Sequence, residues 1–333
     1  MKTRDPAGQS EDTVQKQWQA VIDLLHTVHH DYQQAKKQME EVCLLFSGRE
    51  NAVERQLQDV LEITLSTVNK RDSSKDISCL QVNCLGNFEV FVGCHRIEQW
   101  YSLKAKAVFK YIIVQRQHLI SKDMLMEALW QDCPPDLANS NLKTAIHSLR
   151  KTLGSVSPER SGFMYIHFIE GHYLINPNMT LLVDDEEFEK QWLNGQRHES
   201  EGNFPGAIAA YLAAESYYKG DYLEEDLYED WTLMRREALK DTYLNILIKL
   251  ATYSAQAADY ENCIGFCRKI LAKDPCCEEG YRHLMRCYSR LGQRNRAIQW
   301  YKVCDKTVTT ELGIKPEPLT ISLHQRLIND ETI

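Results

Sequence analysis

An internal repeat of 34 residues in the second half of the chain constrains the fold more than any other feature. Five positions keep the same internal spacing in three copies: Gly202, Phe204, Ala207, Tyr211 and Ala214; Ala258, Tyr260, Cys263, Cys267 and Ile270; and Gly292, Arg294, Ala297, Tyr301 and Cys304. Helix–turn–helix units of this length, with small residues where paired helices cross, are typical of tetratricopeptide proteins. The first two copies start 56 residues apart. We therefore expect about 22 inserted residues to lengthen the helix around residues 231–253.

The cysteines are interpreted as packing residues. Three of the 11 cysteines, Cys263, Cys267 and Cys304, occupy repeat positions that alanine, tyrosine or isoleucine holds in other copies, which favours burial over metal binding. The sequence has neither the paired CxxC motifs of structural zinc sites nor the P-loop, GxGxxG, HExxH or GxSxG motifs of common enzymes. We expect no metal, no cofactor and no catalytic residue. The number of cysteines favours one alternative, a redox- or metal-responsive sensor.

Composition and hydropathy predict a globular protein of the cytoplasm that does not enter a membrane. Hydrophobic residues make up 43% of the chain and charged residues 26%, as in an average globular protein. The best apolar run, residues 108–114, is interrupted by Lys110 and is too short to span a bilayer. The first 20 residues are polar and mixed in charge, unlike a secretory signal.

Charge is distributed unevenly along the chain. The whole chain carries a net charge of −8, but residues 79–180 hold 10 Lys and Arg against 8 Asp and Glu, a net charge of +2. Residues 1–78 carry −3 and residues 181–333 carry −7. A local positive field can therefore exist in an acidic protein, and the middle segment is the one suited to nucleic acid.

The N-terminal segment has the pattern of a long amphipathic helix. Apolar residues recur every 3.5 residues over 14–46, and a second, shorter helix follows the Ser47-Gly48 break. We expect a disordered tail at 1–13, a helical or coiled-coil segment at 14–69 and a polar linker at 70–78. Either a homodimer through residues 14–46 or a helical hairpin would bury the apolar stripe.

The middle segment, residues 79–180, predicts a winged helix-turn-helix of the α+β type. Alternation and turn residues predict strands from Leu80 to Val92 around a Gly86-Asn87 turn, and a third at Cys94–Ile97. Helices are expected at Leu103–His118, from Ser121 to Trp130, and from Leu137 to a stop at Gly154, and a hairpin at Met164–Phe168 and His172–Ile175. This order presents the third helix to a DNA major groove. From Asp184 onward the pattern is helical, so residues 181–333 form the expected repeat domain, and the whole protein is mainly α.

The third helix has one apolar face and one polar face free of acids. Leu142, Ile146, Leu149 and Leu153 share the apolar face. The expected base-reading residues on or beside the polar face are Ser140, Thr144, His147 and Ser148. The expected phosphate and backbone contacts are Lys104, Lys106, Lys143, Arg150, Lys151 and His172. An ordinary solvated helix face has the same composition, and that interpretation remains open.

The chain resembles the SARP family of bacterial transcriptional activators, which joins an OmpR-type winged helix to a tetratricopeptide-like bacterial transcriptional activator domain. The matching motifs are Lys104–Ala107, Leu125–Trp130 with Pro134-Pro135, Ile146–Gly154, Gly171–Leu174, Tyr218–Asp221, Asp230-Trp231 with Arg235-Arg236, Asp274-Pro275 with Glu278, and Glu311–Pro316. The resemblance covers residues 79 to about 330, and the N-terminal helices lie outside it. Ser148 stands where the family usually has a DNA-contacting arginine.

The resemblance implies a regulator that binds double-stranded promoter DNA and contacts RNA polymerase, with activation as the expected outcome. The loop from Trp130 to Ser140 is the expected polymerase contact, through Gln131, Asp132 and Asp136. The repeat domain would bind a protein partner on its surface. The alternative is a protein-interaction scaffold whose winged helix has lost DNA binding, which Ser148 and the modest +2 charge favour.

Overall fold

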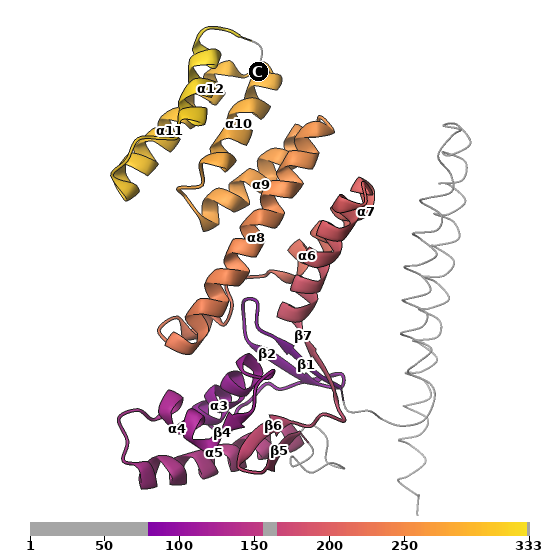
Figure 1. Cartoon of the computed structure of the whole chain (residues 1–333), viewed down its shortest axis with the longest axis vertical. Helices are drawn as coiled ribbons and strands as arrows, with labels where there is room; N and C mark the ends of the chain where they lie inside the picture. The colour runs from indigo at the N-terminus through magenta and orange to yellow at the C-terminus, as the bar shows by residue number, and fades with distance from the viewer. Residues whose placement is uncertain (1–78, 156–164, 332–333) are drawn as a thin grey trace, which may run out of the picture. The chain divides into compact units, whose positions relative to one another are not determined.

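The computed structural model describes residues 79–155 and 165–331, which belong to one compact unit of the chain, Ile77–Ile333. The N-terminal helices expected at 14–69, and the homodimer contact expected at 14–46, lie outside the described residues. Within the described part the chain is mainly helical, with two small sheets near its start (Figure 1). The predicted fold class is confirmed.

A four-stranded sheet opens the described chain, in the order β3-β2-β1-β7. β1 (Cys79–Asn83) pairs antiparallel with β2 (Glu89–Val92), and β2 pairs with the short β3 (His95–Arg96). The strand β7 (Thr180–Val183) pairs in parallel with β1, although sequence patterning did not predict it. The domain boundary expected at residue 180 therefore falls within a strand that completes the first sheet.

Three helices and a second sheet form the winged helix. They are α3 (Leu103–Val114), α4 (Lys122–Leu129) and α5 (Pro135–Ser155), followed by the hairpin of β5 (Ile166–Ile169) and β6 (His172–Ile175). The short β4 (Ile120–Ser121) pairs with β6 and completes this sheet. The Ser121 hydroxyl accepts a hydrogen bond from the Met124 N–H, which confirms the predicted cap of α4.

Three helix ends differ from the sequence prediction. The third helix starts at Pro135. Proline suits a first helical position, because the N–H groups of the first turn have no partner within the helix and proline has no N–H to leave unbonded. Its predicted stop at Gly154 is wrong, because α5 continues through Gly154 to Ser155. The helix expected to reach His118 ends at Val114.

Helices account for the remainder of the described chain. They are α6 (Asp184–Ser200), α7 (Phe204–Tyr217), α8 (Asp230–Gln256), α9 (Tyr260–Lys273), α10 (Glu278–Arg290), α11 (Arg294–Leu312) and α12 (Pro318–Ile328), with a 3-10 turn, η2 (Glu224–Asp226), before α8. The 27 residues of α8 confirm the predicted lengthening. Ala207, Ala297 and the repeat cysteines Cys263, Cys267 and Cys304 are fully buried, as expected of residues at close helix crossings.

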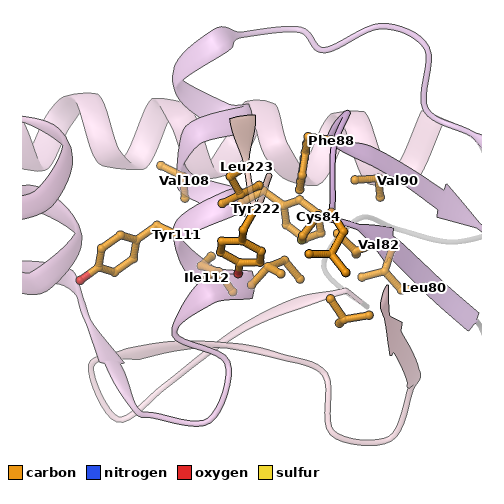
Figure 2. Packing of buried hydrophobic residues seen from close by; sticks show 14 of the residues in the cluster. Leu80, Val82, Cys84, Phe88, Val90, Val108, Tyr111, Ile112, Tyr222 and Leu223 are labelled. Carbon is orange, nitrogen blue, oxygen red and sulfur yellow. The ribbon is translucent and has the colours of Figure 1, made fainter. Parts of the chain in front are cut away.

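The winged helix and the first repeat helices share one hydrophobic core. Tyr222 and Leu223, which precede η2, insert among side chains of β1, β2 and α3 (Figure 2). The backbone is tied at the same place, because the Leu223 N–H donates to the Cys84 carbonyl at 2.8 Å and the Gly86 N–H donates to the Asp221 carbonyl at 3.1 Å. The two halves are therefore packed as one body rather than linked by a flexible segment.

Charged groups reinforce this junction. The Asp184 carboxylate accepts hydrogen bonds from the Cys84 and Leu85 N–H groups at 2.7 and 2.9 Å. Burial, and secondarily the charge of Asp185, raises the pKa of Asp184 to about 6, although the two N–H groups oppose the shift. The fully buried Asp185 bridges Arg116 of the winged helix and Arg235 of α8. The junction thus combines apolar packing with ion pairs that have little access to water.

Residues 79–155 and 165–331 contain neither a helix that could span a membrane nor a cluster that could bind a metal ion. The helices described there are too short or too polar to span a bilayer. In the same residues, His, Cys, Asp and Glu side chains form no group of three or more that could hold a metal ion.

Candidate nucleic-acid interface

The helix α5 presents one polar face to solvent because its other face is anchored in the core. Leu142, Leu149 and Leu153 are fully buried, and Ile146 is 4% exposed. The apolar spacing thus fixes the rotation of the helix about its axis. The predicted residues left exposed on the opposite side are Ser140, Lys143, Thr144, His147 and Lys151.

Of the four predicted base-reading residues, three are exposed. Ser140, Thr144 and His147 lie at intervals of four and three, so their side chains emerge on one side of α5. Thr144 donates its hydroxyl to the Ser140 carbonyl at 3.0 Å. Ser148 is half-buried at the edge of this face. The helix therefore offers a short polar face about two turns long.

Arg150 holds the wing in place. Its guanidinium donates two hydrogen bonds to the Ile166 carbonyl, from Nε at 3.2 Å and from an Nη at 3.0 Å. Desolvation lowers the pKa of this guanidinium. These bonds join α5 to β5, so Arg150 helps to position the wing, and the phosphate contact expected from the sequence stays a prediction.

The two lysines of α3 also have partners. Lys104 is exposed, but its ammonium donates to the Leu129 carbonyl at 3.0 Å and lies 5.5 Å from the centre of the Trp130 ring. Lys106 pairs with Glu225 of η2 at 2.6 Å. Its buried neighbour Lys110 pairs with the same carboxylate and with Asp226. Lys106 therefore takes part in the junction with the repeat helices, and its expected phosphate contact stays a prediction.

The exposed cations that remain near the polar face are Lys143 and Lys151. Neither forms an ion pair with a described residue. Lys151 lies over the ring of Tyr101, 4.4 Å from its centre, and Lys143 is exposed one residue before Thr144. Both ammonium groups are available to an anion.

The wing is a tight hairpin beside α5. Glu170 and Gly171 both have positive φ, 50° and 83°, as a two-residue turn of this type requires. His172 is half-buried, and its Nδ1 lies 2.9 Å from the Glu170 carbonyl oxygen. Phe168 and Ile169, which are not among the predicted site residues, are about half exposed at the end of β5. Because both residues are apolar, nothing in the sequence indicated that they lie on the surface.

The connection between α4 and α5 is shorter than expected. Only residues 130–134 are non-helical, because α5 already begins at Pro135. Gln131 and Asp132 are exposed in this loop, and Asp136 is exposed in the first turn of α5. The three residues expected to contact polymerase therefore lie together at the N-terminal end of the helix.

Several proteins with similar sequences are named as transcriptional regulators. Residues 183–328 match the model of the bacterial transcriptional activator domain. The transcriptional regulatory protein MoaR1 of Mycobacterium tuberculosis is 24% identical over 231 residues, which cover 68% of this chain and 72% of MoaR1. The regulatory protein DnrI of Streptomyces peucetius is 24% identical over 218 residues, 64% of this chain and 79% of DnrI.

A solved structure extends the similarity to the fold. Mycobacterium tuberculosis EmbR, solved in complex with a low-affinity phosphopeptide, matches with a TM-score of 0.63 at 19% identity, over 76% of this chain and 66% of that one. In sequence, the transcriptional regulatory protein EmbR of that organism is 22% identical over 239 residues, which cover 69% of this chain and 58% of EmbR.

A winged helix packed against tetratricopeptide-like helices defines a class of regulatory protein. Residues 183–328 carry a bacterial transcriptional activator domain, and the relatives similar in sequence are named as transcriptional regulators.

Proposed function

We propose that this protein is a sequence-specific DNA-binding regulator that places α5 in the major groove of promoter DNA. The observation that carries the proposal is the exposed polar face of α5, on which no acidic residue follows Asp136. Side chains such as His147 and Thr144 have the size and hydrogen-bonding groups to contact base edges. Lys143 and Lys151 flank them and would hold phosphates.

The experiment is a titration of the full-length protein and its variants against DNA. The probes are a duplex selected from a random pool by the wild-type protein and a scrambled duplex, at two salt concentrations. His147→Ala and Thr144→Ala should reduce discrimination between the two duplexes by about 1–3 kcal/mol each. Lys143→Ala and Lys151→Ala should weaken binding to both duplexes and reduce the salt slope by about 0.9 each.

A matched control is Lys306→Ala, since Lys306 is an exposed lysine of α11 far along the chain from α5. It should leave both affinities unchanged. Ser148→Arg introduces the arginine that the resembled family usually has at this position. It should tighten DNA binding and change the DNA sequence that the protein selects from the pool. If the wild-type protein selects no sequence, or if the four alanine variants bind as it does, α5 is not the reader.

We further propose that the regulator activates transcription by contacting RNA polymerase near the start of α5. Gln131, Asp132 and Asp136 lie exposed there, beside the helix that would occupy the groove. Asp132→Asn and Asp136→Asn should lower transcription from a bound promoter in a purified system and leave DNA affinity unchanged. Equal transcription with wild type and both variants would contradict this contact.

The second candidate function is a protein-interaction scaffold. It is favoured by the observation that Arg150 and Lys106 are used inside the molecule, which leaves few cations for phosphate. In either case the repeat helices would bind a protein partner, because residues 181–333 carry a net charge of −7, which repels DNA.

A further inference from the structure

A small pocket lies between the C-terminal end of α8 and the helix α10. It has a volume of about 240 Å³, and its walls come from the last turns of α8, the start of α9 and the second half of α10. Tyr260, Ala255 and Cys287 supply apolar surface. This volume is below the 300–1,000 Å³ or so typical of cofactor sites and suits a single side chain.

Two arginines line this pocket without a carboxylate partner. Arg286 and Arg290 are exposed, and neither forms an ion pair or hydrogen bond with a described residue. Desolvation and the charge of Arg282 lower the pKa of Arg286. Positions 282, 286 and 290 share one face of α10, and Arg282 is already paired with Glu317 at 2.6 Å. The carboxylate of Glu279 opposes the shift of Arg286 but forms no ion pair with it. The pocket therefore keeps two arginines without an ion-pair partner among the described residues, within a segment whose net charge is −7.

A buried histidine of the same pocket has an unused polar atom. His283 is 7% exposed, and its Nδ1 is buried with no hydrogen-bond partner. Its Nε2 lies 3.3 Å from the Thr252 hydroxyl of α8 and 3.9 Å from a Glu279 carboxylate oxygen. Burial, and then the charge of Arg286, lowers the pKa of His283, which favours the neutral form of the ring. Buried polar atoms without partners are rare in folded proteins and are often associated with a functional site.

The cysteine thiols beside the pocket do not supply a reactive or charged group to it. The Cys287 Sγ lies 3.1 Å from the Cys263 Sγ. The contact with Cys263 and burial together raise the pKa of Cys287, which keeps it as an unreactive thiol. Cys287 therefore serves as apolar wall, and the charged groups of the pocket are its two arginines.

We propose that this pocket binds an anionic side chain of a partner peptide, with Arg286 and Arg290 holding the anion. A carboxylate or a phosphorylated side chain has this chemistry, and either would form charge-assisted hydrogen bonds with guanidinium groups. DNA is disfavoured because the surrounding segment is acidic and the pocket accepts one group, not a continuous backbone. The inference rests on the proposed protein-binding role of the repeat helices and is independent of DNA binding by α5.

The test uses purified full-length protein on three peptide arrays. The arrays hold blocked hexapeptides with glutamate, phosphoserine or glutamine at one central position and randomised residues elsewhere. We expect binding to the glutamate or phosphoserine array, and the stronger of the two identifies the source of the anion. The double variant Arg286→Gln/Arg290→Gln should weaken the best peptides about tenfold or more.

The matched control is Arg268→Gln, which removes an exposed arginine of α9 that does not line the pocket. It should bind the peptides as the wild type does. The inference is overturned if the glutamine array binds as well as the other two, or if the double variant and the control give the same signal. The double variant should also keep the wild-type affinity for the selected DNA duplex. Loss of that affinity would assign the arginines to nucleic acid and overturn the inference.

Discussion

Single buried polar atoms have predictable effects on the stability of this protein. The Tyr222 hydroxyl is buried in the shared core and has no hydrogen-bond partner within the described residues. Tyr222→Phe removes a desolvated group without creating a cavity, so we expect the free energy of unfolding to be unchanged or to rise by about 1–3 kcal/mol. Urea unfolding measures this difference.

A second tyrosine provides the comparison. The Tyr218 hydroxyl donates to the Asp221 carboxylate at 2.8 Å. Tyr218→Phe should therefore lower the free energy of unfolding by about 1–2 kcal/mol. A clear loss of stability in Tyr222→Phe, equal to that of Tyr218→Phe, would show that the Tyr222 hydroxyl has a partner after all.

Asp184 makes the stability of the junction depend on pH. Its pKa of about 6 in the folded protein lies above the usual 3.8, so the folded state binds the proton more tightly than the unfolded state. The contribution of this carboxyl to stability is therefore largest below pH 4 and is lost as the pH rises to about 6. The full effect is up to about 3 kcal/mol.

The variant Asp184→Asn removes this titration and keeps an acceptor oxygen for one of the two N–H groups, of Cys84 or Leu85. The difference in unfolding free energy between variant and wild type should shift in favour of the variant between pH 4 and pH 7. Urea unfolding at a series of pH values measures it. A difference that does not change with pH would mean that the carboxyl has an ordinary pKa.

At the scale of elements, two roles of Arg150 on α5 can be told apart by experiment. If its guanidinium holds β5 through the Ile166 carbonyl, Arg150→Gln should lower the free energy of unfolding by about 1–3 kcal/mol and leave the salt slope of DNA binding unchanged. A phosphate contact predicts the reverse, with a slope reduced by about 0.9 and unchanged stability. Lys143→Ala, on the exposed face, is the comparison for the second outcome.

At the scale of the whole molecule, the apolar stripe over residues 14–46 predicts self-association. One helix of this length cannot bury so wide a stripe by itself. Light scattering should give a larger mass than one chain for the full-length protein and a single-chain mass for a version starting at Asp76. Single-chain masses for both would favour the helical hairpin.

Local patterns in the sequence predicted the elements and the orientation of α5. The 34-residue repeat, the cap at Ser121 and the apolar spacing from Leu142 to Leu153 all act over a few residues or one helix face. They therefore depend little on the rest of the fold. For the same reason, the exposure of Ser140, Thr144 and His147 could be predicted from helical periodicity alone.

Only the tertiary structure decided which charged residues remain available. Lys106 and Glu225 are 119 residues apart, and the partners of Arg150 and β7 are likewise set by packing between separate elements. A lysine on a helix face has the same sequence pattern whether it meets solvent or a distant carboxylate. The sequence by itself thus determined most of the elements, the repeat and the polar face of α5, but not the strand β7. The assembly of the winged helix and the repeat helices around Tyr222 and Leu223 determined which cations are consumed inside the molecule, because such contacts depend on three-dimensional proximity and not on spacing along the chain.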